Sequence, residues 1–341
     1  MRIDTSDYFP WQSWSPPNKN SRGPVIYYCP VKEIAPENKK PTNFRKKGKI
    51  TGWCSWYALG GTINESNLLE QAEKIKEKHL DCQYFLIDDG WCVWGDWMMP
   101  ERLKFPHGFK DLTVKIKSKG FKIGLWMAPF LVSPKSQIYK RHHDWLVRDK
   151  KGNLVEGLKF TLFDRYLPWN KYILDFSQKE ARNYIINCID YVVRSYRVSL
   201  LKLDFLYAPY FDPKLSDDRP PHRYLTELFD HIRNKFPEVY LMVSGCPYKP
   251  ARYLAHSIRV SQDNAVPWLY SIPLVRKYIH SKRLSYLEKN MSLLKKHAKY
   301  FNSDPDVYFE KAKIGLTQRQ LGKLKNIVFS SKVCFSGEKY S

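Results

Sequence analysis

Lys202 and Asp204 are charged residues two positions apart in an otherwise apolar run, residues 200–205. Side chains at positions i and i+2 of a β-strand lie on the same face, so a strand here places an amine beside a carboxylate. Such a pair could serve catalysis, form a structural salt bridge, or provide a lysine for Schiff-base chemistry. The spacing alone is compatible with all three roles.

A second acidic group, Asp88 and Asp89, follows another apolar run and precedes Gly90 and Trp91. Carboxylates accept strong hydrogen bonds from hydroxyl groups, and aromatic rings pack against the apolar C–H patches of a sugar ring. Paired acids could instead hold a divalent metal or form an exposed turn. Neither alternative explains the nearby tryptophans, so we expect a sugar site without metal or cofactor; these tryptophans are Trp53, Trp56, Trp91, Trp94, Trp97 and Trp126.

A third group, Arg259, Ser261 and Asp263, shares one face of another predicted strand. An arginine beside a carboxylate usually lowers the pKa of that carboxylate, so a charge-paired structural role is the simpler interpretation. The functional interpretation makes Asp263 the second carboxylate of a glycosidase, opposite Asp204. Retaining glycosidases hold the two groups about 5–5.5 Å apart, and inverting ones about 6.5–9.5 Å apart.

Two further polar clusters are interpreted as structural. Asp304 and Asp306 flank Pro305, and Asp-Pro is a common start of a turn, so we expect a capped turn there. His142 and His143 are adjacent, and adjacent residues of a helix point apart, which does not favour a metal site.

The elements that carry these groups alternate along the chain from residue 50 onward. Helical segments with a 3.6-residue apolar period, such as 68–75, lie between short apolar runs, a pattern typical of βα units. The predicted strands are 50–54, 84–87, 122–127, 200–205, 239–243, 258–261, 300–303 and 333–336.

Eight such strands can close into a barrel or form an open, doubly wound sheet. Carboxylates, Trp and Gly follow nearly every predicted strand, whereas an open sheet would concentrate them at one switch point. We therefore predict an α/β fold, a (β/α)8 TIM barrel over residues 49–341, after a short N-terminal extension over residues 1–48. The long insert 129–174 is expected to form a lid or a pocket wall.

The amino-acid composition limits which classes of function fit this chain. Lys and Arg number 57 against 34 Asp and Glu, which gives a net charge of +23. Such a balance suggests nucleic acid, but the lysines are spread along helix-like segments and no nucleic-acid motif occurs, so we expect no specific nucleic-acid partner.

The sequence has no signal-peptide-like start and no run of 18 apolar residues, which predicts a cytoplasmic protein without membrane contact. The 7 Cys lack zinc-site spacing and are expected to be reduced.

Six ordered motifs together resemble glycoside hydrolase family 36, the α-galactosidase (melibiase-like) group that shares a clan with family 27. The resemblance spans residues 50–341 and implies a retaining hydrolase that cleaves terminal α-galactosides through a covalent glycosyl-enzyme. It implies Asp204 as the nucleophile and Asp263 as the general acid/base. The motifs are GWCSW at 52–56, IDDGW at 87–91, LKLD at 201–204, SGC at 244–246, RVSQD at 259–263 and NSDPD at 302–306.

The same resemblance implies how a terminal galactose would be bound. Asp88 and Asp89 would bind the O4 and O6 hydroxyls, and Lys202 and Arg259 would bind neighbouring hydroxyls. The implied partner is an α-galactoside oligosaccharide or glycoconjugate. The remaining implied substrate-binding residues are Trp53, Trp91, Trp126 and Cys246.

The sequence also departs from the family pattern. Family 36 proteins usually carry an N-terminal β-sandwich and a C-terminal β-domain, whereas here about 50 residues precede the barrel and the chain stops after the eighth strand. That sandwich normally helps to form the pocket and the oligomer, so the outer subsites stay open and a homo-oligomer is possible. The alternatives are a raffinose-synthase-like galactosyltransferase, a catalytically weak carbohydrate-binding barrel and, last, a basic nucleic-acid-binding protein.

Overall fold

The computed structural model describes most of the chain from residue 48 onward. Of residues 1–48, which we predicted to be an extension, it describes strands β1 (Ser13–Ser15) and β2 (Val25–Tyr27), which pair antiparallel, and residue 48. The division into an extension and a barrel therefore stays a prediction. Beyond β1 and β2, the described ranges are 48–158, 170–211, 221–246, 251–252, 254–261, 263–264, 273–295, 298–310 and 316–341.

The central sheet has nine parallel strands in the order β12-β11-β10-β9-β5-β4-β3-β14-β13. Four of the eight predicted strands have the predicted bounds, and the others differ by at most two residues at either end. The strands are β3 (Ile50–Cys54), β4 (Tyr84–Ile87), β5 (Lys122–Met127), β9 (Val198–Leu203), β10 (Tyr240–Val243), β11 (Ser257–Arg259), β12 (Asn302–Asp304), β13 (Val307–Tyr308) and β14 (Val333–Ser336).

The two end strands of this order, β12 and β13, are consecutive in the chain. Only Pro305 and Asp306 separate them, so they are two parts of one interrupted strand that pairs with β11 before the break and with β14 after it. The sheet thereby curls round on itself, which confirms the predicted TIM-barrel-like α/β fold. Strand order follows chain order, and helices α2, α3, α5, α6, α8 and α9 lie in the connections between parallel neighbours.

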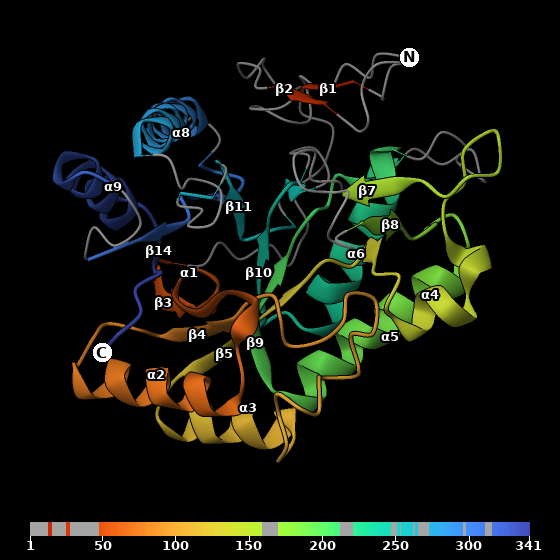
Figure 1. The fold of residues 1–341 in the computed structure, drawn as a ribbon, viewed down its shortest axis with the longest axis horizontal. Helices are drawn as coiled ribbons and strands as arrows, with labels where there is room; N and C mark the ends of the chain where they lie inside the picture. Colours follow the sequence, from red (N-terminus) through yellow and green to blue (C-terminus); the bar gives the residue numbers. More distant parts are fainter. Residues whose placement is uncertain are drawn as a thin grey trace.

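Helices cover the outside of the curled sheet, and α2 and α3 lie side by side beneath β4 and β5 (Figure 1). Each buries one apolar stripe, such as Leu68, Ala72 and Ile75 of α2, against the strands. The helices are α1 (Ser55–Leu59), α2 (Glu65–Glu77), α3 (Phe109–Ser118), α5 (Lys179–Ser195), α6 (Pro221–Lys235), α8 (Pro273–Leu294) and α9 (Gln318–Ser330), with 3-10 turns η1 (Gly60–Thr62) and η3 (Ala208–Phe211).

The predicted insert 129–174 forms a small unit at one side of the barrel (Figure 1). Its strands make a three-stranded antiparallel sheet in the order β6-β8-β7, next to a short helix. Residues 159–169, between β7 and β8, lie outside the described part, and the role as a lid or wall stays a prediction. The elements are β6 (Leu131–Val132), α4 (Gln137–Arg141), η2 (His143–Trp145), β7 (Glu156–Leu158) and β8 (Lys171–Ile173).

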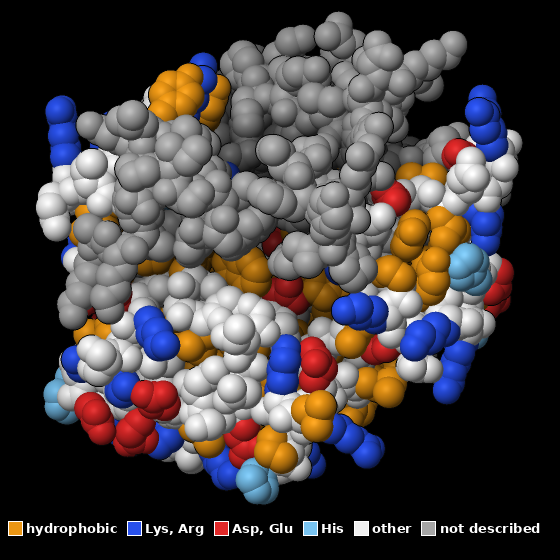
Figure 2. All heavy atoms as spheres, viewed as in Figure 1, with side chains coloured by type: hydrophobic (Ala, Val, Ile, Leu, Met, Phe, Trp, Pro, Cys, Tyr) orange, Lys and Arg blue, Asp and Glu red, His pale blue; other side chains and the backbone are white. Residues whose placement is uncertain are grey.

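On the face that Figure 2 shows, Lys and Arg side chains are interspersed with Asp and Glu side chains. On this face the Lys and Arg side chains do not gather into one basic patch. None of the helices in the described ranges is long and apolar enough to cross a bilayer.

Candidate active site

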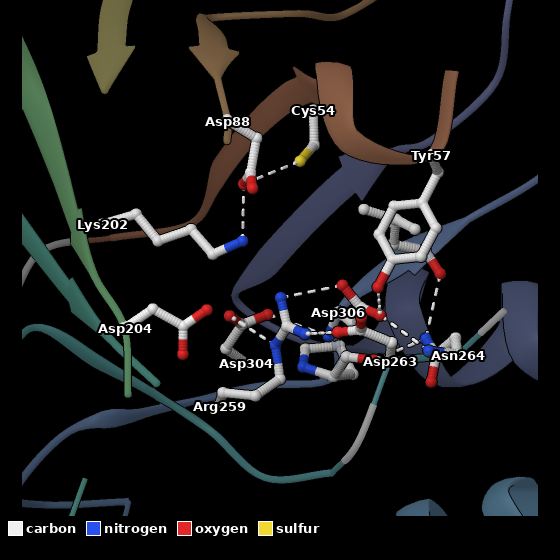
Figure 3. Close-up of polar contacts among 12 residues, drawn as sticks. Cys54, Tyr57, Asp88, Lys202, Asp204, Arg259, Asp263, Asn264, Asp304 and Asp306 are labelled. Carbon is white, nitrogen blue, oxygen red and sulfur yellow. Dashed lines mark hydrogen bonds and ion pairs between the residues drawn. The ribbon is translucent and has the colours of Figure 1, made fainter. Parts of the chain in front are cut away.

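The predicted chemical groups meet at the carboxyl ends of the barrel strands, as expected for a TIM barrel. Figure 3 shows two clusters that converge there. One consists of Asp88, after β4, Cys54 at the end of β3, and Lys202 in β9; the other surrounds Arg259 at the end of β11. Asp204 follows β9 beside them.

Lys202 pairs with Asp88, and not with the Asp204 of its own strand. Its Nζ lies 2.6 Å from Asp88 Oδ2, and both residues are buried, at 5% and 3% exposure. The Cys54 thiol donates to the same carboxylate oxygen at 3.4 Å. Burial alone would lower the pKa of Lys202, but the Asp88 carboxylate opposes it and the pKa is raised, so Lys202 stays a cation. An amine held as a cation is a poor nucleophile, which argues against the Schiff-base interpretation.

Asp204 is held in place at the rim with its side chain partly exposed. Trp126 Nε1 donates to its Oδ2 at 3.2 Å, and the backbone N–H of Phe205 donates to its Oδ1 at 2.7 Å. Phe205 has a φ of +53°, the left-handed region that a bulky residue adopts only where the surroundings enforce it. Both carboxylate oxygens therefore receive a donor while the group remains accessible.

Asp89 lies next to Asp88 but in different surroundings. Trp94 Nε1 donates to Asp89 Oδ1 at 2.7 Å, and Lys171 of β8 lies 4.9 Å from the centre of the Trp94 ring. Burial raises the pKa of Asp89 to about 6; the Trp94 hydrogen bond opposes the rise, and the nearby Asp88 charge adds to it. Two adjacent aspartates that look alike in the sequence thus have different surroundings, an ion pair with Lys202 for Asp88 and an indole N–H for Asp89.

Arg259 binds three carboxyl groups at once. Its Nε lies 3.1 Å from Asp304 Oδ2, one terminal nitrogen 2.8 Å from Asp306 Oδ1, and the other 3.4 Å from Asp263 Oδ1. The side chains of Asp304 and Asp306 are buried at 3% and 0% exposure, whereas that of Asp263 is 43% exposed. Arg259 is thus charge-paired, as the simpler interpretation expects, while Asp263 remains partly exposed at the rim.

The turn predicted at Asp304 and Asp306 is present, but both aspartates also bind groups outside the turn. Asp304 Oδ1 accepts the backbone N–H of Asp306 at 2.9 Å, which caps the turn. Asp306 Oδ2 also accepts from the Tyr57 hydroxyl and, at 2.8 Å, from the Asn264 N–H. Sequence reasoning missed Tyr57 and Asn264, which bring neutral hydrogen-bond donors to Asp306 from elsewhere in the chain.

A small cavity in the barrel interior lies between the two clusters. It is lined by Lys202 and Cys54 on one side and by Arg259, Asp304 and Asp306 on the other, with apolar residues between them. The interior beneath the rim is therefore charged on both sides. Among the residues that the structure describes, no group of three His, Cys, Asp or Glu side chains has the arrangement to hold a metal ion.

The predicted aromatic residues divide between rim and core. All three indoles are nearly buried, at 2% exposure for Trp126, 1% for Trp53 and 0% for Trp91, but only Trp126 donates its N–H to a rim carboxylate, that of Asp204. Trp53 Nε1 donates to the Glu338 carbonyl and Trp91 Nε1 to the Trp126 carbonyl, and Trp91 stacks on Phe109 of α3. The structure therefore does not bring these two indoles to the cluster at the rim.

Cys246, after β10, is also fully buried, at 0% exposure. Burial raises the pKa of its thiol well above the ordinary value, so it is an unreactive thiol at neutral pH. The preceding Gly245 has a φ of +59°, and a Cβ there would lie 2.9 Å from the Tyr207 ring. The backbone turn after β10 thus needs a glycine to bring Cys246 under the rim.

Curated proteins that resemble this chain are α-galactosidases. A curated relative, α-galactosidase AgaA of Geobacillus stearothermophilus, is 28% identical over 203 residues, which cover 54% of this chain and 26% of the relative. A probable α-galactosidase C of Aspergillus flavus is 29% identical over 220 residues, 58% of this chain and 27% of the relative. The chain thus spans about a quarter of the length of these relatives.

Solved structures share the fold. The α-galactosidase TtGalA of Thermus thermophilus, solved with stachyose, superposes with a TM-score of 0.73 at 23% identity over 93% of this chain and 67% of that one. Family 36 AgaA superposes with a TM-score of 0.60 at 19% identity over 86% and 39% of the two chains. The family model named Melibiase matches residues 36–253, more than half of the chain. The expected family is confirmed, and the chain belongs to the melibiase family.

Proposed function

We propose that this chain is the catalytic barrel of a glycoside hydrolase that cleaves terminal α-galactosides. The observation that carries the proposal is the Asp204 carboxylate, accessible at the barrel rim, with a hydrogen-bond donor on each oxygen. Two donors hold the carboxylate in one orientation, as a nucleophile that attacks from a fixed direction requires. Membership of the melibiase family and the α-galactosidase relatives support this substrate class.

The proposed reaction is a double displacement with retention. Asp204 attacks the anomeric carbon while Asp263 donates its proton to the departing glycosidic oxygen, which leaves the galactosyl group bonded to Asp204. Asp263 then takes a proton from water, and the water oxygen displaces Asp204 and restores the enzyme. The exposure of Asp263 supports this role, because the group must reach both the leaving oxygen and solvent water.

The residues proposed to contact the sugar differ in how exposed their side chains are. Asp89 is partly exposed and offers an oxygen to a hydroxyl group directly. Asp88, Lys202 and Arg259 are nearly buried, so little of each side chain is left to contact a hydroxyl group. Trp126 lines the site beside Asp204. Trp53, Trp91 and Cys246 support these groups from behind instead of touching the sugar.

Release of nitrophenol from the α-galactoside, compared with the α-glucoside, α-mannoside and α-N-acetylgalactosaminide, tests the proposal. We expect turnover of the galactoside, and Asp204→Asn should lower kcat/KM by at least about 10³-fold because it removes the nucleophile. Asp111→Asn, which changes a half-exposed carboxylate on α3, is the control and should keep full activity. A folded protein that cleaves none of the four substrates would contradict the hydrolase assignment.

A fluorinated galactoside that slows the second step should leave a sugar covalently attached to Asp204, which mass spectrometry of peptides detects. Finding the sugar on another residue would reject Asp204 as the nucleophile. Adding raffinose or sucrose as acceptor separates hydrolysis from transfer, because a galactosyltransferase would convert the acceptor to a longer oligosaccharide faster than it releases galactose.

A further inference from the structure

The indole of Trp94 connects the rim carboxylates with the small sheet of the insert. Its Nε1 donates to Asp89 Oδ1 at 2.7 Å, and its ring centre lies 4.9 Å from that of Trp126, which donates to Asp204. Lys171 of β8, in the insert, places its Nζ 4.9 Å from the centre of the Trp94 ring. The insert therefore reaches the site through Lys171 and Trp94.

Trp94 also offers aromatic surface at the rim. It is partly exposed, whereas the neighbouring Trp126 is nearly buried. Phe205, the residue after Asp204, is partly exposed as well, and its ring centre lies 5.4 Å from that of Trp94. Rings of this kind pack against the apolar C–H patches of a sugar. An accessible aromatic surface thus lies beside Asp204.

Lys171 and Asp89 carry opposite charges around the same indole. Both side chains are partly exposed. Burial lowers the pKa of Lys171, and the Asp89 charge opposes that shift. Burial likewise raises the pKa of Asp89, and the Lys171 charge is among the groups that oppose the rise. The two charges therefore act on each other across the Trp94 side chain.

Such a pair is suited to a hydroxyl group. An ionised carboxylate only accepts hydrogen bonds and an ammonium group only donates them, whereas a hydroxyl group does both. One hydroxyl can therefore donate its hydrogen to Asp89 while its oxygen accepts from Lys171. Both bonds would be charge-assisted, which makes them stronger than bonds between neutral groups.

We propose that Lys171 is a specificity-determining residue of the sugar site, and that it donates to the same galactoside hydroxyl that donates to Asp89, beside the Trp94 ring. This inference rests on the proposed function, in which Asp89 binds a sugar hydroxyl. It gives the insert a direct part in substrate recognition, because β8 carries Lys171 to the rim.

A purely structural role of Lys171 has different consequences. A lysine beside an indole can hold the insert against the barrel through a cation–π contact alone. Its replacement would then disturb the rim as a whole and weaken the binding of every galactoside alike. Recognition of one hydroxyl instead predicts a loss that disappears when the sugar lacks that hydroxyl.

Binding of methyl α-galactoside and of its 2-, 3-, 4- and 6-deoxy forms, measured by titration calorimetry, separates these roles. All proteins carry Asp204→Asn, so that the sugar is not consumed. We expect Lys171→Met to weaken binding of the parent sugar about tenfold, because a charge-assisted hydrogen bond is lost. For one deoxy form the loss should fall below about twofold, and the same deoxy form should cancel the effect of Asp89→Asn.

Lys122→Met is the matched control. Lys122 also lies beside an aromatic ring, with its Nζ 5.5 Å from the centre of the Tyr84 ring. It is the first residue of β5, however, at the opposite end of the barrel from the rim. This variant should bind all five sugars as the Asp204→Asn protein does.

Four outcomes would overturn the proposal: unchanged affinity in folded Lys171→Met, a loss equal for all five sugars, an equal loss in Lys122→Met, or different deoxy forms cancelling the effects of Lys171→Met and Asp89→Asn. Turnover of nitrophenyl α-galactoside by the wild type is measured in parallel. Binding without turnover would reject the proposed hydrolysis, while the five sugars still decide the role of Lys171. No binding of any of them would reject both.

Discussion

Among single residues, Lys202 shows most clearly how a charge is accommodated inside this barrel. Its ammonium group and Asp88 are both nearly buried and lie 2.6 Å apart. Removing one partner of such a pair leaves a charge in a poorly solvated interior. We expect Lys202→Met to lower the free energy of unfolding by about 3–5 kcal/mol, measured by urea denaturation followed by circular dichroism.

The double variant Asp88→Asn/Lys202→Met tests whether the loss of stability in Lys202→Met comes from the unpaired Asp88 charge. It leaves no unpaired charge, so it should recover much of the stability lost in Lys202→Met, although it should remain inactive if these groups bind the sugar. A single variant as stable as the wild type would contradict the burial of the pair.

At the level of the elements, closure of the barrel depends on how closely β3 approaches its neighbours. A Cβ at Gly52 would lie 2.4 Å from the Phe335 ring of β14 and 2.6 Å from the Tyr84 carbonyl of β4. At Gly322, on the exposed side of α9, a Cβ would meet nothing within 4 Å. The same substitution should therefore have opposite effects at the two positions.

We expect Gly52→Ala to lower the free energy of unfolding by about 1–3 kcal/mol through overpacking. Gly322→Ala should raise it by about 0.5–1 kcal/mol, because alanine is the better helix former. Thermal unfolding of the two variants beside the wild type measures both. Equal stability of the two variants would mean that β3 and β14 are not packed as described.

For the whole molecule, the buried acids predict how stability varies with pH. The pKa of Asp306 is about 7 in the fold, raised mainly by burial, against about 3.9 for an aspartate in an unfolded chain. Between about pH 4 and pH 7 the folded state therefore holds more protons than the unfolded state at this site, and the free energy of unfolding falls as pH rises. Asp89, with a pKa of about 6, acts in the same direction.

Asp306→Asn removes one of these sites. Urea denaturation at several pH values should show a flatter dependence in the variant, with the slope reduced by up to about 1.4 kcal/mol per pH unit within this window. Parallel curves for variant and wild type would mean that Asp306 does not retain a proton in the fold.

The sequence by itself determined the fold class, the strand positions and the chemical groups at the strand ends. Apolar runs bounded by polar residues are local patterns, so β4, β5 and β14 begin and end where the sequence predicts. Family motifs tie several residues to fixed positions, so the resemblance alone predicts Asp88 and Arg259 as site residues.

Only the tertiary structure decided which groups meet. Two-residue periodicity says that Lys202 and Asp204 share a face, but the partner of Lys202 is Asp88, which follows β4 and lies more than 100 residues earlier in the chain. Periodicity also cannot say which face is interior: Cys54 contacts Asp88 inside the barrel, so its neighbour Trp53 points into the outer core. The burial of Asp306 likewise arises from tertiary contacts, because Tyr57 of α1 and the segment 259–264 around β11 both lie far from it in the chain.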